Sequence, residues 1–174
     1  MLLDIFIEQI VKKKSGAREN AILFGAVVSA VFLLFAVAAI AFSFLAFAAM
    51  GIGYGLWRVF QSQYIEFEYA VTNGDIDIDR ITGKRRRKRI VSVAGAKVER
   101  FGRYRDGWDP KQFDRYVMTA STAADPENWC FTYRSKRSGN TLVVFSPEER
   151  VLEAFVKGLP RQLRHEAQQT IHNS

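Results

Sequence analysis

An uncharged run from Ala21 to Trp57 limits most strongly what this chain can fold into. The run contains no Asp, Glu, Lys, Arg, His, Asn, Gln or Pro, which is untypical of a soluble domain. As one helix it would extend ~55 Å at ~1.5 Å per residue, whereas the hydrocarbon core of a bilayer is ~30 Å thick. We therefore predict a two-helix transmembrane hairpin over residues 18–60, with its turn around Ile40–Phe44.

Basic residues flank the run on both sides and predict its orientation. Lys12, Lys13 and Lys14 precede it, Arg58 and the stretch Lys84–Arg89 follow it, and the expected turn carries no charge. Because basic segments stay on the cytoplasmic side, we expect a multi-pass protein of the plasma (inner) membrane with both termini in the cytoplasm. A cleaved signal peptide does not fit, because its apolar region would span only about 7–15 residues.

Gly51 and Gly55 form a Gly-x-x-x-Gly pair inside the run and are candidate helix-packing residues. Small residues at this spacing allow two helix backbones to approach closely in a bilayer. The pair therefore packs the second helix against the first, or it forms a homodimer face. The first interpretation is favoured, since such motifs are frequent in membrane helices.

Residues 1–17 are expected to form an amphipathic helix in the membrane interface. Asp4, Glu8 and Lys12 would share one helical face at four-residue spacing. The apolar side chains of Leu3, Phe6, Ile7 and Ile10 would lie opposite. Such a helix could place its lysines at headgroup level, or it could pack on the globular part of the chain.

From Gln61 onward the pattern changes from helical to alternating, which predicts a mainly-β domain over residues 61–174, on the cytoplasmic side. Ile65–Val71 alternates apolar and polar side chains, and Asn73-Gly74 predicts a two-residue hairpin turn. Six further strands are expected over Asp75–Arg80, Ile90–Val93, Lys97–Phe101, Arg115–Ala120, Trp129–Arg134 and Thr141–Phe145.

A helix is expected after the last strand. Ser146 is the predicted N-cap, Pro147 the first helical residue, and Glu149 the partner in a capping box. Leu159-Pro160 ends this helix, and Arg161–Gln169 suits a further short polar helix. Seven antiparallel strands and a C-terminal capping helix are the element order of the pleckstrin-homology (PH) superfold, although another seven-stranded topology would give the same order.

Three stretches carry a resemblance to a known family: Ile10–Lys14, Tyr64–Val93 and Phe145–Pro160. They resemble a family of uncharacterised small bacterial membrane proteins that combine a lysine run, a two-helix hairpin and a PH-like sheet. The resemblance implies a membrane location and a PH-like domain. It brings no catalytic residues.

The run Lys84–Arg89 is the most prominent polar feature. Six adjacent cations suit an anionic partner, and each base near an anionic leaflet contributes ~1 kcal/mol. Alternate residues of a strand face opposite sides, so we expect the run to lie mostly in a turn or at a strand end. The other interpretation is a solvated strand end, paired with the aspartates at 75, 77 and 79 across the hairpin. It is favoured over specific lipid binding, since charge runs are usually solvated. The candidate anionic-lipid contacts are Lys12, Lys13, Lys14, Lys84, Arg85, Arg86, Arg87, Lys88 and Arg89.

A second group interleaves aromatic and basic side chains between Phe101 and Tyr116. Such a pattern can bind nucleic acid or membrane headgroups, or it can fold back over the sheet. We favour the covering role. The members of the group are Phe101, Arg103, Tyr104, Arg105, Trp108, Lys111, Phe113, Arg115 and Tyr116.

Nothing in the sequence indicates catalysis, a metal site or a cofactor. Cys130 is the only cysteine, and His165 and His172 lack further ligands at metal-binding spacing. We expect a membrane-anchored interaction module, not an enzyme, that presents a PH-like domain to the cytoplasmic leaflet and binds anionic lipid, a protein partner or both. The alternative is a structural subunit of a membrane complex, with the hairpin as its contact surface. Nucleic acid is the least expected partner, because no recognised binding motif surrounds the basic run.

Overall fold

The computed structural model describes residues 6–104 and 107–172 of the chain. The chain separates into two units, which are treated one at a time below. The helical unit contains Lys14–Ile65 and Thr82–Arg86, and the β unit contains the remaining residues.

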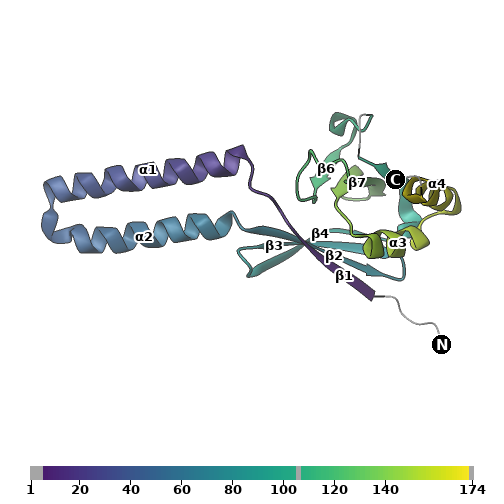
Figure 1. Ribbon diagram of the computed structural model, residues 1–174, viewed down its shortest axis with the longest axis horizontal. Coiled ribbons are helices and arrows are strands. Elements are labelled where there is room, and N and C mark those ends of the chain that lie inside the picture. Colours follow the sequence, from purple (N-terminus) through teal and green to yellow (C-terminus); the bar gives the residue numbers. More distant parts are fainter. Residues whose placement is uncertain (1–5, 105–106, 173–174) are drawn as a thin grey trace. The chain divides into compact units, whose positions relative to one another are not determined.

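Two helices and a tight turn form the helical unit. Helix α1 covers Ala17–Ile40, a 3-10 turn η1 covers Phe42–Phe44, and helix α2 covers Leu45–Ser62 (Figure 1). The two helices of the predicted hairpin and the turn between them are thereby confirmed. At ~1.5 Å per residue, the 24 residues of α1 extend about 36 Å and the 18 residues of α2 about 27 Å. Both helices are long and apolar enough to cross a membrane.

The hairpin leaves its large apolar side chains uncovered. Phe24 and Phe35 on α1 are each 72% exposed, and Phe47 on α2 is 70% exposed. Neither candidate span buries any of its residues within the structure. Exposure of this extent is far more than a water-soluble surface carries in one continuous patch. The helices therefore need an apolar environment or a partner.

The N-terminal segment is a strand, so the predicted amphipathic helix at residues 1–17 is wrong over the described part. Strand β1 covers Phe6–Lys12 and pairs antiparallel with β2, Ile65–Thr72. Residues 1–5 lie outside the described residues. The β-branched Ile7, Ile10 and Val11 favour a strand. The sequence pattern alone suits a helix as well as a strand, and the pairing with β2 decides for the strand.

The first sheet has the order β1-β2-β3-β4, with β3 at Asp75–Thr82 and β4 at Arg86–Val93. Asn73 and Gly74 both have positive φ values, 52° and 87°, as the predicted two-residue turn requires. Strand β4 begins four residues earlier than expected and includes the second part of the basic run.

The second sheet has the order β5-β7-β8-β6. In it β6 runs parallel to β8, whereas the other pairs are antiparallel. The expected seven-stranded antiparallel sheet is therefore corrected to eight strands in two sheets over the described residues, because β1 adds a strand and β6 joins β8 in parallel. The remaining elements are η2 Gly95–Lys97, β5 Val98–Arg103, η3 Pro110–Gln112, β6 Arg115–Met118, β7 Trp129–Ser135 and β8 Gly139–Phe145.

Aromatic side chains from both sheets and from helix α3, Glu149–Gly158, meet in the core of the β unit. The rings of Tyr69 and Phe145 lie 5.8 Å apart between centroids, and that of Phe131 lies 5.4 Å from Phe145 and 5.2 Å from Phe155. Helix α4, Arg161–His172, follows α3 and extends past the predicted Gln169. Helix α3 supplies the expected capping helix.

The start of α3 differs from the predicted capping box. Glu148 is the N-cap residue and makes no side-chain cap bond. The Ser146 hydroxyl instead donates to Asn128 Oδ1 at 2.5 Å. Gln9 of β1 takes over part of the role, because its amide accepts from the Glu148 N–H at 2.7 Å and donates to the Ser146 carbonyl at 3.1 Å. The N-terminal strand thus holds the segment that leads into α3.

Candidate functional site

The basic run Lys84–Arg89 is divided between a turn and a strand. Lys84 and Arg85 lie in the β3–β4 turn, and Arg86–Arg89 lie in β4. All six side chains are exposed. Of the two expected places, a turn or a strand end, the strand end holds for most of the run, because four of its residues begin the edge strand β4. Carboxylates on the neighbouring strands β2 and β3 compensate the charges of two of these four residues, Arg87 and Arg89.

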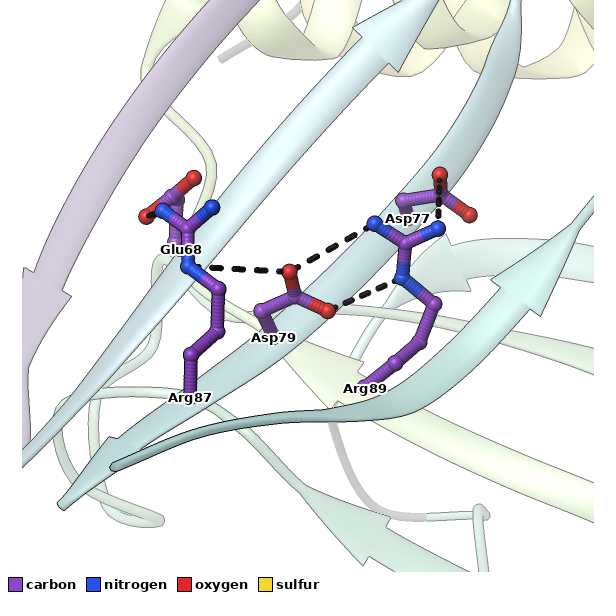
Figure 2. Close-up of polar contacts among 5 residues, drawn as sticks. All are labelled: Glu68, Asp77, Asp79, Arg87 and Arg89. Atoms are coloured by element: carbon purple, nitrogen blue, oxygen red, sulfur yellow. Dashed lines mark hydrogen bonds and ion pairs between the residues drawn. The ribbon is translucent and has the colours of Figure 1, made fainter.

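Arg87 and Arg89 form an ion-pair network with three carboxylates (Figure 2). Arg87 pairs with Glu68, and its Nε lies 3.8 Å from Asp79 Oδ2. Arg89 donates from Nε to Asp79 Oδ1 at 2.9 Å, and its Nη1 lies 2.8 Å from Asp77 Oδ2. Asp79 therefore lies between the two guanidinium groups and contacts both. The predicted pairing of the aspartates with the run holds for Asp77 and Asp79.

The network covers carboxylates that are almost fully buried. The side chains of Glu68 and Asp79 are 7% and 9% exposed, whereas those of Arg87 and Arg89 are 57% and 55% exposed. A desolvated carboxylate is costly unless it is paired and hydrogen-bonded. The hydrogen bond to Asp79, with the charge of Asp77, raises the pKa of Arg89 above its usual value. Three carboxylates outnumber two guanidinium groups, so the network offers no net positive charge to an anion.

Asp75 has a different role from the other two aspartates. Its carboxylate accepts a hydrogen bond from the Gly95 N–H at 3.1 Å, at the start of η2. It therefore ties the end of the β2–β3 turn to the connection that leads into the second sheet. The alternating pattern of β3 does not distinguish this role of Asp75 from the roles of Asp77 and Asp79.

The other bases of the run have no carboxylate partner among the described residues. Arg85, Arg86 and Lys88 make no ion pair there, and Lys84 Nζ lies 5.1 Å from the centroid of the Tyr64 ring. Of the N-terminal lysines, Lys12 ends β1 opposite Glu66, and Lys12, Lys13 and Lys14 are all exposed. The run thus contains a compensated end and an uncompensated end.

The two glycines of the Gly-x-x-x-Gly pair do not face α1. A Cβ atom placed on Gly51 or Gly55 would meet no atom within 4 Å, apart from neighbouring backbone of its own helix. The interpretation that they pack α2 against α1 is therefore wrong. The pair lies on an open face of the hairpin.

Comparison with known proteins supports the fold. A family model described as "Bacterial PH-like domain (DUF6106)" matches residues 3–165. The chain belongs to this bacterial PH-like domain family. The match includes the hairpin as well as both sheets, and it confirms the family resemblance that three short stretches indicated. The chain matches none of the curated proteins and none of the solved structures with which it was compared.

An aromatic segment covers the outer side of the second sheet of the PH-like domain. Tyr104, Trp108 and Phe113 pack against a cluster formed by Ala120, Cys130, Leu142 and Val144. Arg100 stacks on Trp108, with its Cζ 4.2 Å from the ring centroid. The covering role predicted for this segment is confirmed for these residues. Phe101 differs, because it is buried and stacks on Trp129.

Cys130 is buried under this cover. Burial raises the pKa of its thiol to about 12, so the thiol stays protonated at neutral pH. It is therefore unreactive toward a maleimide in the folded PH-like domain. A topology experiment needs an introduced cysteine.

Both histidines of the PH-like domain line one open cavity of about 640 Å³ between α3 and α4. Glu153, Lys157 and Gln169 also line it. Within the described residues, no group of three His, Cys, Asp or Glu side chains could hold a metal ion. Sequence spacing did not indicate this cavity, because the cavity depends on how α3 and α4 pack against each other across the short connection Leu159-Pro160.

Proposed function

We propose that this protein is a membrane-anchored interaction module. In this proposal the hairpin α1–α2 crosses the inner membrane, and the PH-like domain faces the cytoplasmic leaflet and binds anionic lipid headgroups there. One observation carries the proposal: the hairpin exposes apolar side chains along both helices, while exposed basic side chains lie just before α1 and, at Arg58, near the C-terminal end of α2. No catalytic residue is part of it.

Anionic lipid is favoured as the partner because exposed bases lie before α1 and beside the C-terminal end of α2. Each base near an anionic leaflet contributes ~1 kcal/mol, and the effect falls off within a Debye length of ~8–10 Å. Lys14 lies three residues before α1, and Arg85 and Arg86 line a cavity together with Arg58 of α2. Nucleic acid is disfavoured, since no recognised binding motif surrounds these bases.

Topology can be tested with one introduced cysteine in the full chain. Lys136, in the β7–β8 turn, is exposed and suits a Lys136→Cys substitution in a Cys130→Ala background. We expect carbonate-washed membranes to retain the protein, and we expect an impermeant maleimide to label it only after the cells are opened. Labelling in intact cells, or release by carbonate, would contradict the proposal.

An alternative is an assembly subunit whose hairpin contacts another membrane protein or a second copy of this chain. The open face at Gly51 and Gly55 favours it, because close helix contact in a bilayer uses small residues. Gly55→Leu should then reduce the mass of the detergent-solubilised complex, whereas Ala49→Leu on the same helix is the matched control. An unchanged mass for Gly55→Leu would count against this alternative.

A further inference from the structure

A basic cavity lies where α2 ends, inside the helical unit. Its volume is about 350 Å³, at the lower end of the ~300–1,000 Å³ typical of small-ligand sites. Three guanidinium side chains line it, those of Arg58, Arg85 and Arg86. The other lining residues are Val59, Gln61, Ser62, Thr82 and Gly83. Arg58 is remote from the basic run in sequence, and only the fold brings it to Arg85 and Arg86.

The β3–β4 turn is fixed against the end of α2 by its backbone. The Gly83 N–H donates to the Tyr64 carbonyl at 2.7 Å, and the Arg85 N–H donates to the Thr82 carbonyl at 3.3 Å. Gly83 has a φ of 60°, and a Cβ atom there would lie 3.2 Å from the Gln61 carbonyl oxygen. The close approach therefore requires glycine, and it sets Arg85 and Arg86 beside Arg58.

Within the described part of the chain, no carboxylate compensates these three arginines. None of Arg58, Arg85 and Arg86 takes part in an ion pair among the residues that the structure describes. Glu19, the sole acidic residue in the sequence of the helical unit, accepts a hydrogen bond from the Gly16 N–H at 3.1 Å, at the start of α1. The C-terminal end of α2 carries a partial negative charge, which the guanidinium groups outweigh.

A second hollow adjoins the first, because Gln61 and Gly83 line both. It has a volume of about 290 Å³, and Trp57, Phe60, Tyr64 and Lys84 contribute to its lining. Trp and Tyr are enriched at membrane–water interfaces. An arginine cavity next to such aromatic side chains suits a phosphate group attached to a lipid better than a free anion.

We infer that Arg58, Arg85 and Arg86 form a binding site for the phosphate group of an anionic phospholipid. Guanidinium groups bind phosphate oxygens through paired, charge-assisted hydrogen bonds, which a lysine ammonium cannot reproduce. The inference rests on the membrane location in the proposed function. It differs from a general attraction of basic residues to the leaflet, because it assigns the contact to one cavity and includes Arg58.

The test uses the full chain in detergent, titrated with phosphatidylglycerol or phosphatidylcholine and analysed by native mass spectrometry. The variant Arg58→Gln/Arg85→Gln/Arg86→Gln should bind phosphatidylglycerol about a hundredfold more weakly, since each of the three bases contributes roughly fivefold. The control Arg134→Gln/Lys136→Gln/Arg137→Gln removes three exposed bases from the β7–β8 hairpin and should change affinity less than about twofold. Phosphatidylcholine binding should not change in either variant.

Two further arms keep the result decisive. The single variant Arg86→Gln removes one exposed side chain, should fold, and should weaken phosphatidylglycerol binding about fivefold. Inorganic phosphate at the concentration of the lipid should not displace it. Equal losses in the triple variant and its control, no loss in Arg86→Gln, or displacement by inorganic phosphate would each overturn the site. Release of the wild-type protein by carbonate would overturn the proposed function instead.

Discussion

The two ends of the run Lys84–Arg89 have the same composition and opposite surroundings. Arg87 and Arg89 contact Glu68, Asp77 and Asp79, two of which are almost fully buried. Lys84, Arg85 and Arg86 face no carboxylate among the described residues and lie near the end of α2. A run of like charges is therefore not one functional unit. The carboxylates of the neighbouring strands decide which cations stabilise the fold and which are available to an anion.

The difference follows from desolvation. Glu68 and Asp79 lie under the arginine side chains, and their burial is tolerable only because guanidinium groups pair with them. Exposed bases without a partner have no such role in stability, since surface charges contribute little to folding. The compensated end should thus respond to mutation through stability, and the uncompensated end through binding.

The largest expected effect tests the compensated end. Arg87→Gln should destabilise the protein by about 2 kcal/mol, because the buried Glu68 loses its partner, at a cost of roughly 1–3 kcal/mol. Arg89→Gln should cost less, because Asp79 keeps its contact with Arg87. Thermal unfolding of the full chain in detergent, with hydrogen exchange of β2 and β3, measures the loss. Lys88→Gln, in the same strand between the two arginines, is the matched control and should change stability by less than about 0.5 kcal/mol. Equal effects of the three substitutions would remove the distinction.

The sequence predicted the helical hairpin well, because one physical constraint dominates it. An uncharged run that is too long for one span leaves few alternatives to two spans. Dividing the run into two helices of similar length places the turn at Ile40–Phe44. Asn73-Gly74 was equally informative, since a two-residue turn requires positive φ at both positions. Both signals are local and need no knowledge of the rest of the fold.

The N-terminal strand shows where local reasoning fails. Residues Phe6–Lys12 suit either an amphipathic helix or a strand, and only the pairing with β2 and the bonds of Gln9 to the start of α3 select the strand. The capping box failed for a related reason. Ser146 is engaged by Asn128, which lies 18 positions earlier in the sequence.

The candidate site was predicted in part. Charge alternation indicated that Asp77 and Asp79 could pair with the basic run, and they do. Glu68 was not singled out, because it looks like any outward residue of an alternating strand. Arg58 was assigned only to topology, since its proximity to Arg85 and Arg86 depends on a backbone bond between Gly83 and Tyr64.

A smaller effect would sharpen the comparison by removing one carboxylate from the compensated end. Asp77→Asn removes the most exposed carboxylate of the network and leaves Arg89 paired with Asp79 alone. The compensated end then loses one negative charge, so binding of phosphatidylglycerol should strengthen by up to about fivefold, while stability falls by less than about 1 kcal/mol. Native mass spectrometry and thermal unfolding measure the two quantities on one preparation. Asp109→Asn, which removes an exposed carboxylate far along the chain, is the control for net charge. If both variants bind the lipid equally, net charge governs the affinity, and the position of each carboxylate beside the run does not.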